Sequence, residues 1–572
     1  MYPAFNANKT QIQEFNPFEG YQQEEDHHHF PPHEIDNTAA GENLPPLEDV
    51  SHTTTRNYRN RSGAPSSFSI GVQDLEETHD HKESIKKISN SSSKTHPTYP
   101  ELNSPAAMEL LSGYRIRFKH LEDQDSIDET TLDCAGKELS TVEIIELAAE
   151  KFIKFSTQQV NGYTMFTHPY RSSAFTSLSI DDTREVELIF QLLTAAEKVG
   201  RRQFDIASKF LARCGWVTSD DGSPVERLAF YLCEALQKRI GKETGIAVPM
   251  KLKKLGLKNE NPVATGTNPT FLAMGTNPTF LACHQALPFN QMLQFTGIQA
   301  IIDQIGTSSK VHLIDMHIRS GVQWTAMMQA LAERRSQIEL MKITAFATTS
   351  DVQQVGETGK RLESFAETFN LTFSFKILVL SDITEVVKEQ FEVQEGEVVA
   401  MYCQTILRTM ITRPQSLENL MRTIRMINPI IVVVAEVEAN HNSTSFVNRF
   451  TETLFFYGAL FDCLEACMSR DNAHRAMVEG VHLAEGMQNT VADEGDERIS
   501  RSVNMNTWRS FFARFGMIEI SLSDSCLYQA NLVLQQFSCA SSCTLENNGK
   551  CLIVGWKGTP LHSLSAWKFI QE

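Results

Sequence analysis

The stretch Val311-His-Leu-Ile-Asp315, followed by Arg319-Ser-Gly-Val-Gln-Trp324, decides the fold of this chain. An apolar run that ends on an acid, then a turn with a glycine, then an amphipathic helix is the opening of a βαβ unit. Enzymes of this architecture place a glycine-rich turn here, so that a cofactor can approach the backbone. This chain has Met316-His-Ile-Arg-Ser320 instead, with Gly321 as the single glycine. We therefore expect side chains to fill the crevice at the top of the sheet, which favours binding over catalysis.

The hydrophobic period changes from helical to strand-like at residue 311. Strand-like runs lie at 311–315, 341–347, 373–380, 397–402, 430–437, 516–522 and 550–556. Helical stretches fall between most of them, at 322–336, 352–369, 415–427, 446–467 and about 524–537. Alternating strands and helices are joined by right-handed crossovers. The sequence therefore predicts an α/β fold with a doubly wound, mostly parallel sheet in residues 307–572.

Residues 139–306 show helical spacing and are expected to form a separate helical region. One helix is predicted after Thr183 as its N-cap, and another after Ser223-Pro224. Their apolar stripes consist of Leu188, Leu192, Ala195 and Val199, and of Val225, Leu228, Leu232 and Leu236. Such stripes can form a dimer seam or the interior of a bundle within one chain. Because the repeat is too short for a coiled coil, the bundle is the safer structural interpretation.

Residues 1–138 are predicted to be a disordered, acidic variable region. They contain proline pairs, a histidine run and a serine run, with few regular apolar spacings. The segment 14–26 mixes aromatic and acidic residues, which is typical of activation or docking segments and equally of a solubilising tail.

An octapeptide, GTNPTFLA, occurs at 266–273 and again at 275–282. Two copies do not make a solenoid, which needs at least three stacked units. Pro269 and Pro278 prevent both copies from lying inside one uninterrupted helix. The repeat is interpreted as a tandem duplication at a loop-to-helix junction.

Composition excludes several classes of protein. The longest wholly apolar run, 430–435, is far shorter than the roughly 20 residues of a membrane span, so no membrane partner is expected. The net charge of −18 disfavours tight binding to nucleic-acid phosphates by the whole chain, although a local basic face remains compatible with it. The eleven cysteines contain no CxxC pair. Cys463/Cys467 and Cys539/Cys543 are each four apart, and we expect ordinary thiols there rather than a metal site.

Asp315 and Glu436 are the best candidates for a ligand pocket. Both are expected at the carboxyl ends of neighbouring central strands, where open α/β sheets bind ligands. The alternative is that both carboxylates cap helix N-termini or pair with nearby bases. His312 is expected to be packed, and Trp324, Trp508, Trp556 and Trp567 are expected to be packing anchors. No glycine fingerprint, phosphate loop, GxSxG or HExxH motif occurs, so no catalytic, cofactor-binding or metal-binding residue is predicted.

Several motifs in order resemble those of the plant GRAS family over roughly residues 139–572. The VHIID-like motif consists of Val311, His312, Leu313, Ile314, Asp315, Gly321, Gln323 and Trp324. Residues 446–466 are similar to the PFYRE region, and Trp556, Ser565, Ala566 and Trp567 resemble the C-terminal SAW motif. Residues 192–199 and 225–240 correspond to the first leucine-rich region. The core is somewhat similar to the DELLA branch, but residues 1–138 contain neither a DELLA nor a TVHYNP-like stretch.

The resemblance implies a plant nuclear transcriptional co-regulator with a methyltransferase-like Rossmann core under a helical cap. It implies no enzymatic activity and no cofactor. The implied partners are DNA-binding transcription factors and other GRAS-type proteins, paired as homo- or heterodimers through the first leucine-rich region, with at most weak direct DNA contact. Met316-His317 stands where the family has a phenylalanine and an acid. Two alternatives stay open: a small-molecule-binding protein or S-adenosylmethionine-dependent methyltransferase on the same fold, and a dimer that binds DNA directly.

Overall fold

The computed structural model describes residues 139–160, 178–246, 278–334, 338–380 and 386–570. The predicted disordered region 1–138 and the first copy of the octapeptide lie outside the described residues. The second copy enters α8 (Pro278–Ala286), which begins at its proline.

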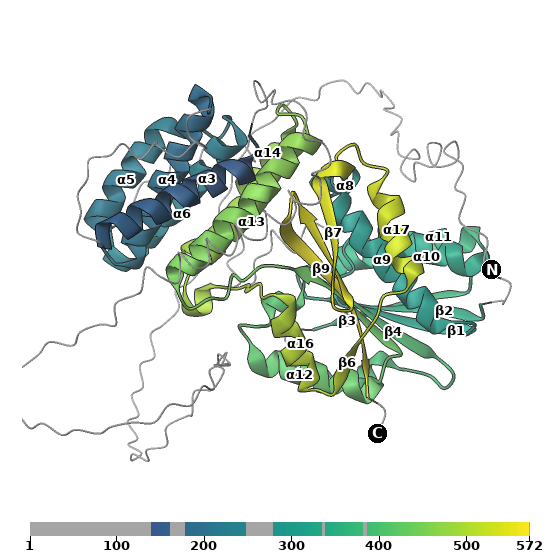
Figure 1. The fold of residues 1–572 in the computed structure, drawn as a ribbon. Helices are drawn as coiled ribbons and strands as arrows, with labels where there is room; N and C mark the ends of the chain where they lie inside the picture. Colours follow the sequence, from purple (N-terminus) through teal and green to yellow (C-terminus); the bar gives the residue numbers. More distant parts are fainter. Residues whose placement is uncertain (1–138, 161–177, 247–277, 335–337, 381–385, 571–572) are drawn as a thin grey trace, which may run out of the picture. The chain divides into compact units, whose positions relative to one another are not determined.

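The central sheet contains five parallel strands in the order β3-β2-β1-β4-β5 (Figure 1). These strands are β1 (Lys310–Asp315), β2 (Leu340–Ala347), β3 (Phe373–Val379), β4 (Val398–Gln404) and β5 (Ile431–Val437). All five were predicted from their apolar runs. The order reverses beside β1, which places β4 between β1 and β5. The prediction that the strands of Asp315 and Glu436 are neighbours is therefore wrong.

Four antiparallel strands extend the sheet beyond β5. They are β6 (Met517–Ile520), β7 (Cys543–Asn548), β8 (Cys551–Trp556) and β9 (Thr559–Phe569). The long strand β9 pairs with β5, β6 and β8. The sequence analysis assigned no strand to β7 or β9, because neither shows a continuous apolar run. Pairing on both sides stabilises β9 despite Pro560 and its serines.

Helices cover both faces of the sheet, so the predicted doubly wound α/β fold is confirmed. One face carries α9 (Pro288–Ile305), α10 (Val322–Ala332), α11 (Val352–Thr368) and α17 (Asp524–Leu534). The other carries α12 (Pro414–Ile427) and α16 (Met505–Ala513), as Figure 1 shows. Because side chains alternate along a strand, Leu313 and Ile314 belong to different hydrophobic cores, one under each face.

The helical cap begins with α3 (Thr141–Val160), α4 (Ile180–Gly200), α5 (Phe204–Val217) and α6 (Pro224–Thr244). Ser223 caps α6 as predicted, accepting a hydrogen bond from the Glu226 N–H. The N-cap of α4 is Ser179 rather than Thr183, because the Asp182 N–H bonds to the Ser179 hydroxyl and the helix starts one turn earlier.

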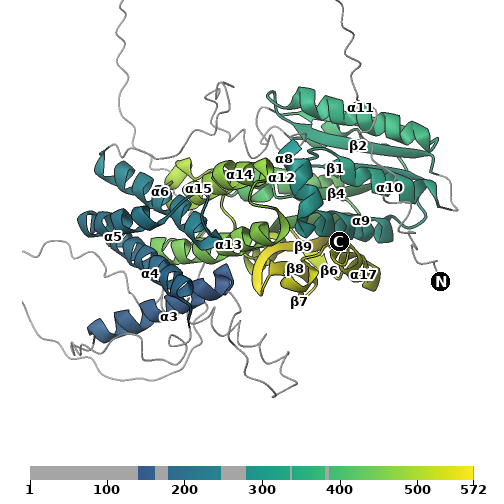
Figure 2. The ribbon, with the colours of Figure 1, turned by 90° about the horizontal axis from the view of Figure 1, so that it is seen from above.

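A second segment far along the chain packs against this cap. It consists of α13 (Phe446–Cys467), α14 (Ala473–Met477), a π-helical turn η6 (Val478–Leu483) and α15 (Ala484–Val491). Figure 2 shows α13 and α15 between α3–α6 and the sheet, and α13 contacts α3, α4, α6 and β9. In contrast, α9 packs on β4, β5 and β9. The predicted boundary at residue 306 therefore differs from the contacts, which assign α9 to the core and α13–α15 to the cap.

A buried ion-pair network joins the two segments of the cap. Arg227 of α6 donates to Glu479 and Glu465, each at 2.9 Å. Arg475 donates to Glu479 at 3.0 Å and also bonds to Glu465. Burial raises the pKa of Glu465, but the hydrogen bonds from Arg475, Arg470 and Arg227 outweigh it and lower the pKa to about 2.

Short 3-10 turns complete the described elements: η4 (Lys388–Phe391), η5 (Leu407–Thr409), η7 (Gly495–Glu497) and η8 (Ala540–Ser542). Among the helices of the described ranges, none combines the length and apolarity that crossing a membrane would take.

Candidate functional site

The turn between β1 and α10 is closed by side chains of the VHIID-like motif itself. Asp315 is completely buried. One of its carboxylate oxygens accepts from the Trp324 indole N–H at 2.7 Å, and the other accepts from the His317 backbone N–H at 2.8 Å. Burial raises the pKa of Asp315 to about 6, although these two hydrogen bonds lower it. Gly321 closes the turn at φ +67°, where a Cβ atom would lie 2.8 Å from Thr358 of α11.

Glu436, at the end of β5, is engaged in the same way. Its two carboxylate oxygens accept from the backbone N–H groups of Arg408 and Val437, each at 3.3 Å. Burial raises its pKa, and the Arg408 guanidinium lowers it. Both acids thus have the geometry of the structural alternative, in which carboxylates hold the loops that follow the strands. Their use in ligand binding stays a prediction.

The other residues of the VHIID-like and SAW-like motifs are mainly buried. His312 bonds to Glu397 at 3.1 Å and to Thr344 at 2.8 Å, and burial lowers its pKa to about 4. The Trp556 indole donates to Asp462 at 2.7 Å, and the Trp567 indole donates to Ser565 at 2.9 Å. The following are also buried: Val311, Leu313, Ile314, Gln323, Trp324 and Ala566.

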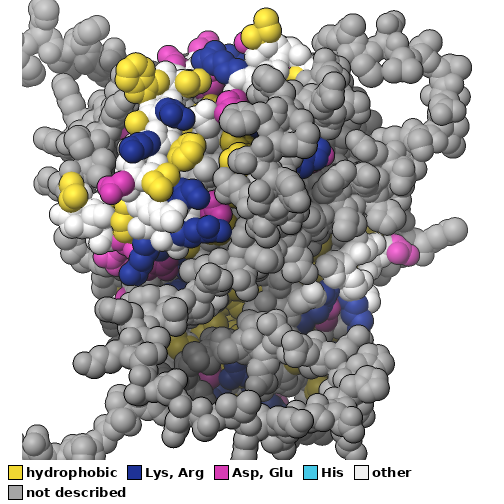
Figure 3. Space-filling view, turned by 60° about the vertical axis from the view of Figure 1, so that its left-hand side comes forward, with side chains coloured by type: hydrophobic (Ala, Val, Ile, Leu, Met, Phe, Trp, Pro, Cys, Tyr) yellow, Lys and Arg dark blue, Asp and Glu magenta, His cyan; other side chains and the backbone are white. Residues whose placement is uncertain are grey.

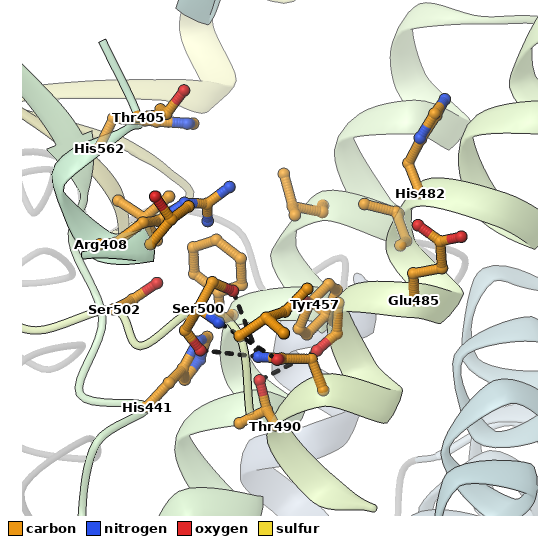
Figure 4. Close-up of a pocket in the computed structure, with 18 of the residues that line it drawn as sticks. Thr405, Arg408, His441, Tyr457, His482, Glu485, Thr490, Ser500, Ser502 and His562 are labelled. Carbon is orange, nitrogen blue, oxygen red and sulfur yellow. Dashed lines mark hydrogen bonds between the residues drawn. The ribbon is translucent and has the colours of Figure 1, made fainter. Parts of the chain in front are cut away.

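A cavity of about 510 Å³ opens at the carboxyl ends of the strands, between the loops of the sheet and the helices α13 and α15 (Figure 4). This finding corrects the expectation that the whole crevice is filled. Side chains fill it at the β1–α10 turn, but α13–α15 roof over a space farther toward β5. Neither Asp315 nor Glu436 lines the cavity. Its lining includes Arg319, Thr405, Arg408, Arg413, His441, Phe456, Tyr457, Leu460, His482, Leu483, Glu485, Gly486, Asn489, Thr490, Asp496, Ser500 and His562.

Basic groups come from the sheet side of the cavity. Arg319 donates to the Thr405 hydroxyl at 2.6 Å and to a ring nitrogen of His317 at 3.4 Å. Burial and the like charge of Arg408 together lower the pKa of Arg319 to about 10. Figure 4 shows Arg408 and Thr405 on this side, opposite Tyr457, His482 and Glu485.

The helix side is aromatic, and uncharged histidines contribute from two places, His482 of η6 and His441 of the loop after β5. Tyr457 fits against α15 because residue 486 is glycine, since a Cβ atom there would lie 2.1 Å from the Tyr457 hydroxyl. His441 stacks on Tyr457 with ring centroids 6.2 Å apart. Burial, together with the charge of Arg498, lowers the pKa of His441 to about 3, so its ring is uncharged at neutral pH.

The described residues of the cavity offer hydrogen-bonding groups and apolar surface to a ligand. The described ranges contain no group of three or more histidine, cysteine or acidic side chains arranged to hold a metal ion. The turn lacks the glycines that let a nucleotide cofactor approach the backbone, and the acid that ends β1 is occupied by Trp324 and His317. The sequence analysis missed Arg319 and Arg408 as cavity residues. Arg319 in a turn that should be glycine-rich was the available signal.

The predicted pairing stripes lie inside the cap. Leu188, Leu192, Val199, Leu228, Leu232 and Leu236 are all buried, in accord with the interpretation as an intramolecular bundle. Pairing through these helices stays a prediction, and it requires other, exposed side chains. Exposed side chains of this region lie on α5. Ile206, Lys209, Arg213 and Trp216 share one side of that helix, and Trp216 is 90% exposed. Figure 3 shows hydrophobic and basic side chains interspersed on this side of the cap.

Comparison with known proteins agrees with the motifs. Residues 188–568 match the model of the GRAS domain family. This chain belongs to the GRAS family. The GRAS protein is 31% identical to DELLA protein RGL1 of Arabidopsis thaliana over 400 residues, which cover 69% of this chain and 73% of RGL1. It is 30% identical to DELLA protein 2 of Medicago truncatula over 427 residues, 74% of each chain. Its fold is similar to the crystal structure of SCL7 from Oryza sativa, with a TM-score of 0.59 and 26% identity over 67% of this chain and 99% of SCL7.

Proposed function

We propose that this member of a plant family of transcriptional regulators acts in the nucleus as a non-enzymatic co-regulator. It binds DNA-binding transcription factors and pairs with other GRAS-type proteins. The observation that carries the proposal is the closed β1–α10 turn. With both oxygens of Asp315 engaged by the protein, the usual cofactor position of this fold is occupied by its own side chains. The protein would then act by binding partner proteins on its outer surfaces.

The α5 face, defined by Ile206, Lys209, Arg213 and Trp216, is the partner surface that we propose for pairing. A tryptophan that is 90% exposed is unusual for a side chain with so much apolar area. Tryptophan and arginine are also the side chains that most often dominate protein interfaces. A second GRAS-type chain is the proposed occupant, because the resemblance assigns pairing to this region.

Co-precipitation from plant nuclear extract tests the proposal. The full-length chain is the bait, and nuclease treatment removes partners bridged by DNA. We expect DNA-binding transcription factors and GRAS-type proteins among the retained proteins. Arg213→Glu with Trp216→Ala should remove the GRAS-type proteins, whereas Tyr528→Ala, an exposed change on α17, should not. Retention of neither class of protein by the wild-type chain would contradict the proposal.

The methyltransferase alternative has one observation in its favour, the cavity at the carboxyl ends of the strands. The missing glycines and the engaged Asp315 speak against a nucleotide-type cofactor there. The alternative of direct DNA binding is supported by Lys209 and Arg213 on α5, against a net charge of −18. Affinity for a duplex that falls steeply between low and physiological salt would support it, since phosphate contacts release counterions.

A further inference from the structure

We propose that the cavity between the sheet loops and α13–α15 binds an amphipathic organic anion, a small molecule with one acidic group and an apolar body. This inference goes beyond the proposed function and does not depend on it. The acidic group would lie at the sheet side, beside Arg319 and Thr405, and the apolar body against α13.

Arg319 supplies the positive charge that would bind the acidic group of the ligand. Arg319 is half-buried, and in the described part of the chain its guanidinium donates to neutral acceptors, the Thr405 hydroxyl and a His317 ring nitrogen. Among the described residues, no carboxylate lies within ion-pair distance of it. Arg408 repels it, and the carboxylates of Asp315 and Glu436 attract it from beyond that distance. A guanidinium in a partly desolvated site gains most from a planar acidic group that accepts two hydrogen bonds.

The backbone is strained at Arg319 and at its hydrogen-bond partner Thr405. Arg319 has a φ of 52° and Thr405 a φ of 53°. The left-handed region is unfavourable for both, and especially for a β-branched threonine. Two strained residues that bond to each other at the wall of a cavity are typical of a functional site rather than of a structural turn.

The wall of the cavity opposite Arg319, formed by the helix side, contains apolar side chains. Phe456 and Leu460 of α13 and Leu483 supply apolar surface. His482 is only 7% exposed, yet neither of its ring nitrogens has a hydrogen-bond partner among the described residues. The same holds for Nε2 of His441, in the loop that follows β5. These neutral rings offer polar contacts to a ligand. The acids of the lining, Glu485 on the helix side and the exposed Asp496, leave the sheet side as the place for a negative group.

The cavity has a volume suited to a small organic molecule. Ligand pockets in proteins typically span about 300–1,000 Å³ and are mainly apolar with a few placed polar groups. The cavity, at about 510 Å³, falls within this range. A two-ring aromatic acid is therefore a suitable probe.

Calorimetric titration of the full-length chain with biphenyl-4-carboxylate and with the neutral biphenyl-4-carboxamide tests the inference. We expect the carboxylate to bind at least about tenfold more tightly, which corresponds to about 1.4 kcal/mol. Arg319→Gln should abolish this preference and leave binding of the carboxamide unchanged. Arg213→Gln, on the α5 face outside the cavity, should change neither affinity.

A second variant protects the test against misfolding of the Arg319 variant. Leu460→Trp fills the apolar end of the cavity and should weaken both probes by about tenfold or more. Equal affinity of the wild-type chain for the two probes would overturn the proposal. So would absence of carboxylate binding, or undiminished binding to the Leu460 variant.

Discussion

At the scale of single residues, Asp315 connects sequence to function most directly. An acid at the end of the first strand is a feature that cofactor-binding folds share, and the sequence alone could not show what it binds here. In the structure, both of its carboxylate oxygens accept hydrogen bonds from residues that are at most nine positions away in the sequence. The donor was visible in the sequence as Trp324. Its distance from Asp315 depends on the tight α10–α11 packing at Gly321, which no local pattern reveals.

Trp324→Phe removes the indole donor and leaves one side of the buried carboxylate without a partner. We expect the free energy of unfolding to fall by about 1.5–3 kcal/mol, the usual range for a hydrogen bond to a charged group. Urea unfolding measures the change. Trp216→Phe is the matched control, because Trp216 is exposed, and it should change the stability by less than about 0.5 kcal/mol. Equal effects of the two changes would contradict this account of Asp315.

Asp315 should also give a pH dependence of known sign. Its pKa is raised from 3.8 to about 6, so between these values the folded chain binds more of this proton than the unfolded chain. Its contribution to the free energy of unfolding therefore falls as the pH rises from about 4 to 6. We expect the stability of the wild type relative to Asp315→Asn to decline over that interval and to level off above it. A difference that does not change with pH would show that Asp315 is not protonated in the fold.

At the scale of elements, the parallel strands could be predicted and the antiparallel ones only in part. Strands β1, β2, β4 and β5 are mainly apolar because both of their faces are covered, which a single sequence displays directly, and the edge strand β3 is only partly buried. Strand β9 contains Pro560 and several polar residues, and it forms because β5, β6 and β8 pair with it. The cavity was equally invisible. Its walls come from β1, β4 and β5 loops and from α13–α15, which only the tertiary fold brings together.

Trp567 anchors β9 to the helix layer below it. Trp567 is 2% exposed, and the centroid of its ring lies 4.7 Å from the ring centroid of Phe512 on α16. Trp567→Ala should lower the free energy of unfolding by about 3–5 kcal/mol, as aromatic truncation in a packed core does. Thermal unfolding provides the measurement. An unchanged melting temperature would mean that this tryptophan contacts partners instead of the core.

The buried network around Arg227 holds the two segments of the cap together. Arg227→Met leaves Glu479 without one of its two cationic partners, and breaking a buried ion pair from one side costs about 3–5 kcal/mol. Hydrogen exchange should show the loss first as faster exchange in α6 and α13. Arg201→Met, which removes a partly exposed pair between the C-cap residue of α4 and Glu197 one turn before it, is the control and should have little effect. If hydrogen exchange in α6 and α13 is unaltered in the Arg227 variant, this network does not hold the two segments of the cap together.

At the scale of the whole molecule, the chain combines a fold used by many cofactor enzymes with a closed cofactor turn. The cap made of α3–α6 and α13–α15 roofs over a cavity with a basic wall, and its outer α5 face presents a tryptophan to solvent. The proposed pairing depends on the exposed α5 face, and the proposed binding of an organic anion depends on the basic wall of the cavity.

Calorimetric titration of the full-length chain with S-adenosylmethionine tests this account most directly. Because Asp315 already binds Trp324 and His317, we expect no binding in the micromolar range and no methyl transfer. Micromolar affinity, weakened by Asp315→Asn and accompanied by transfer of the methyl group, would contradict it.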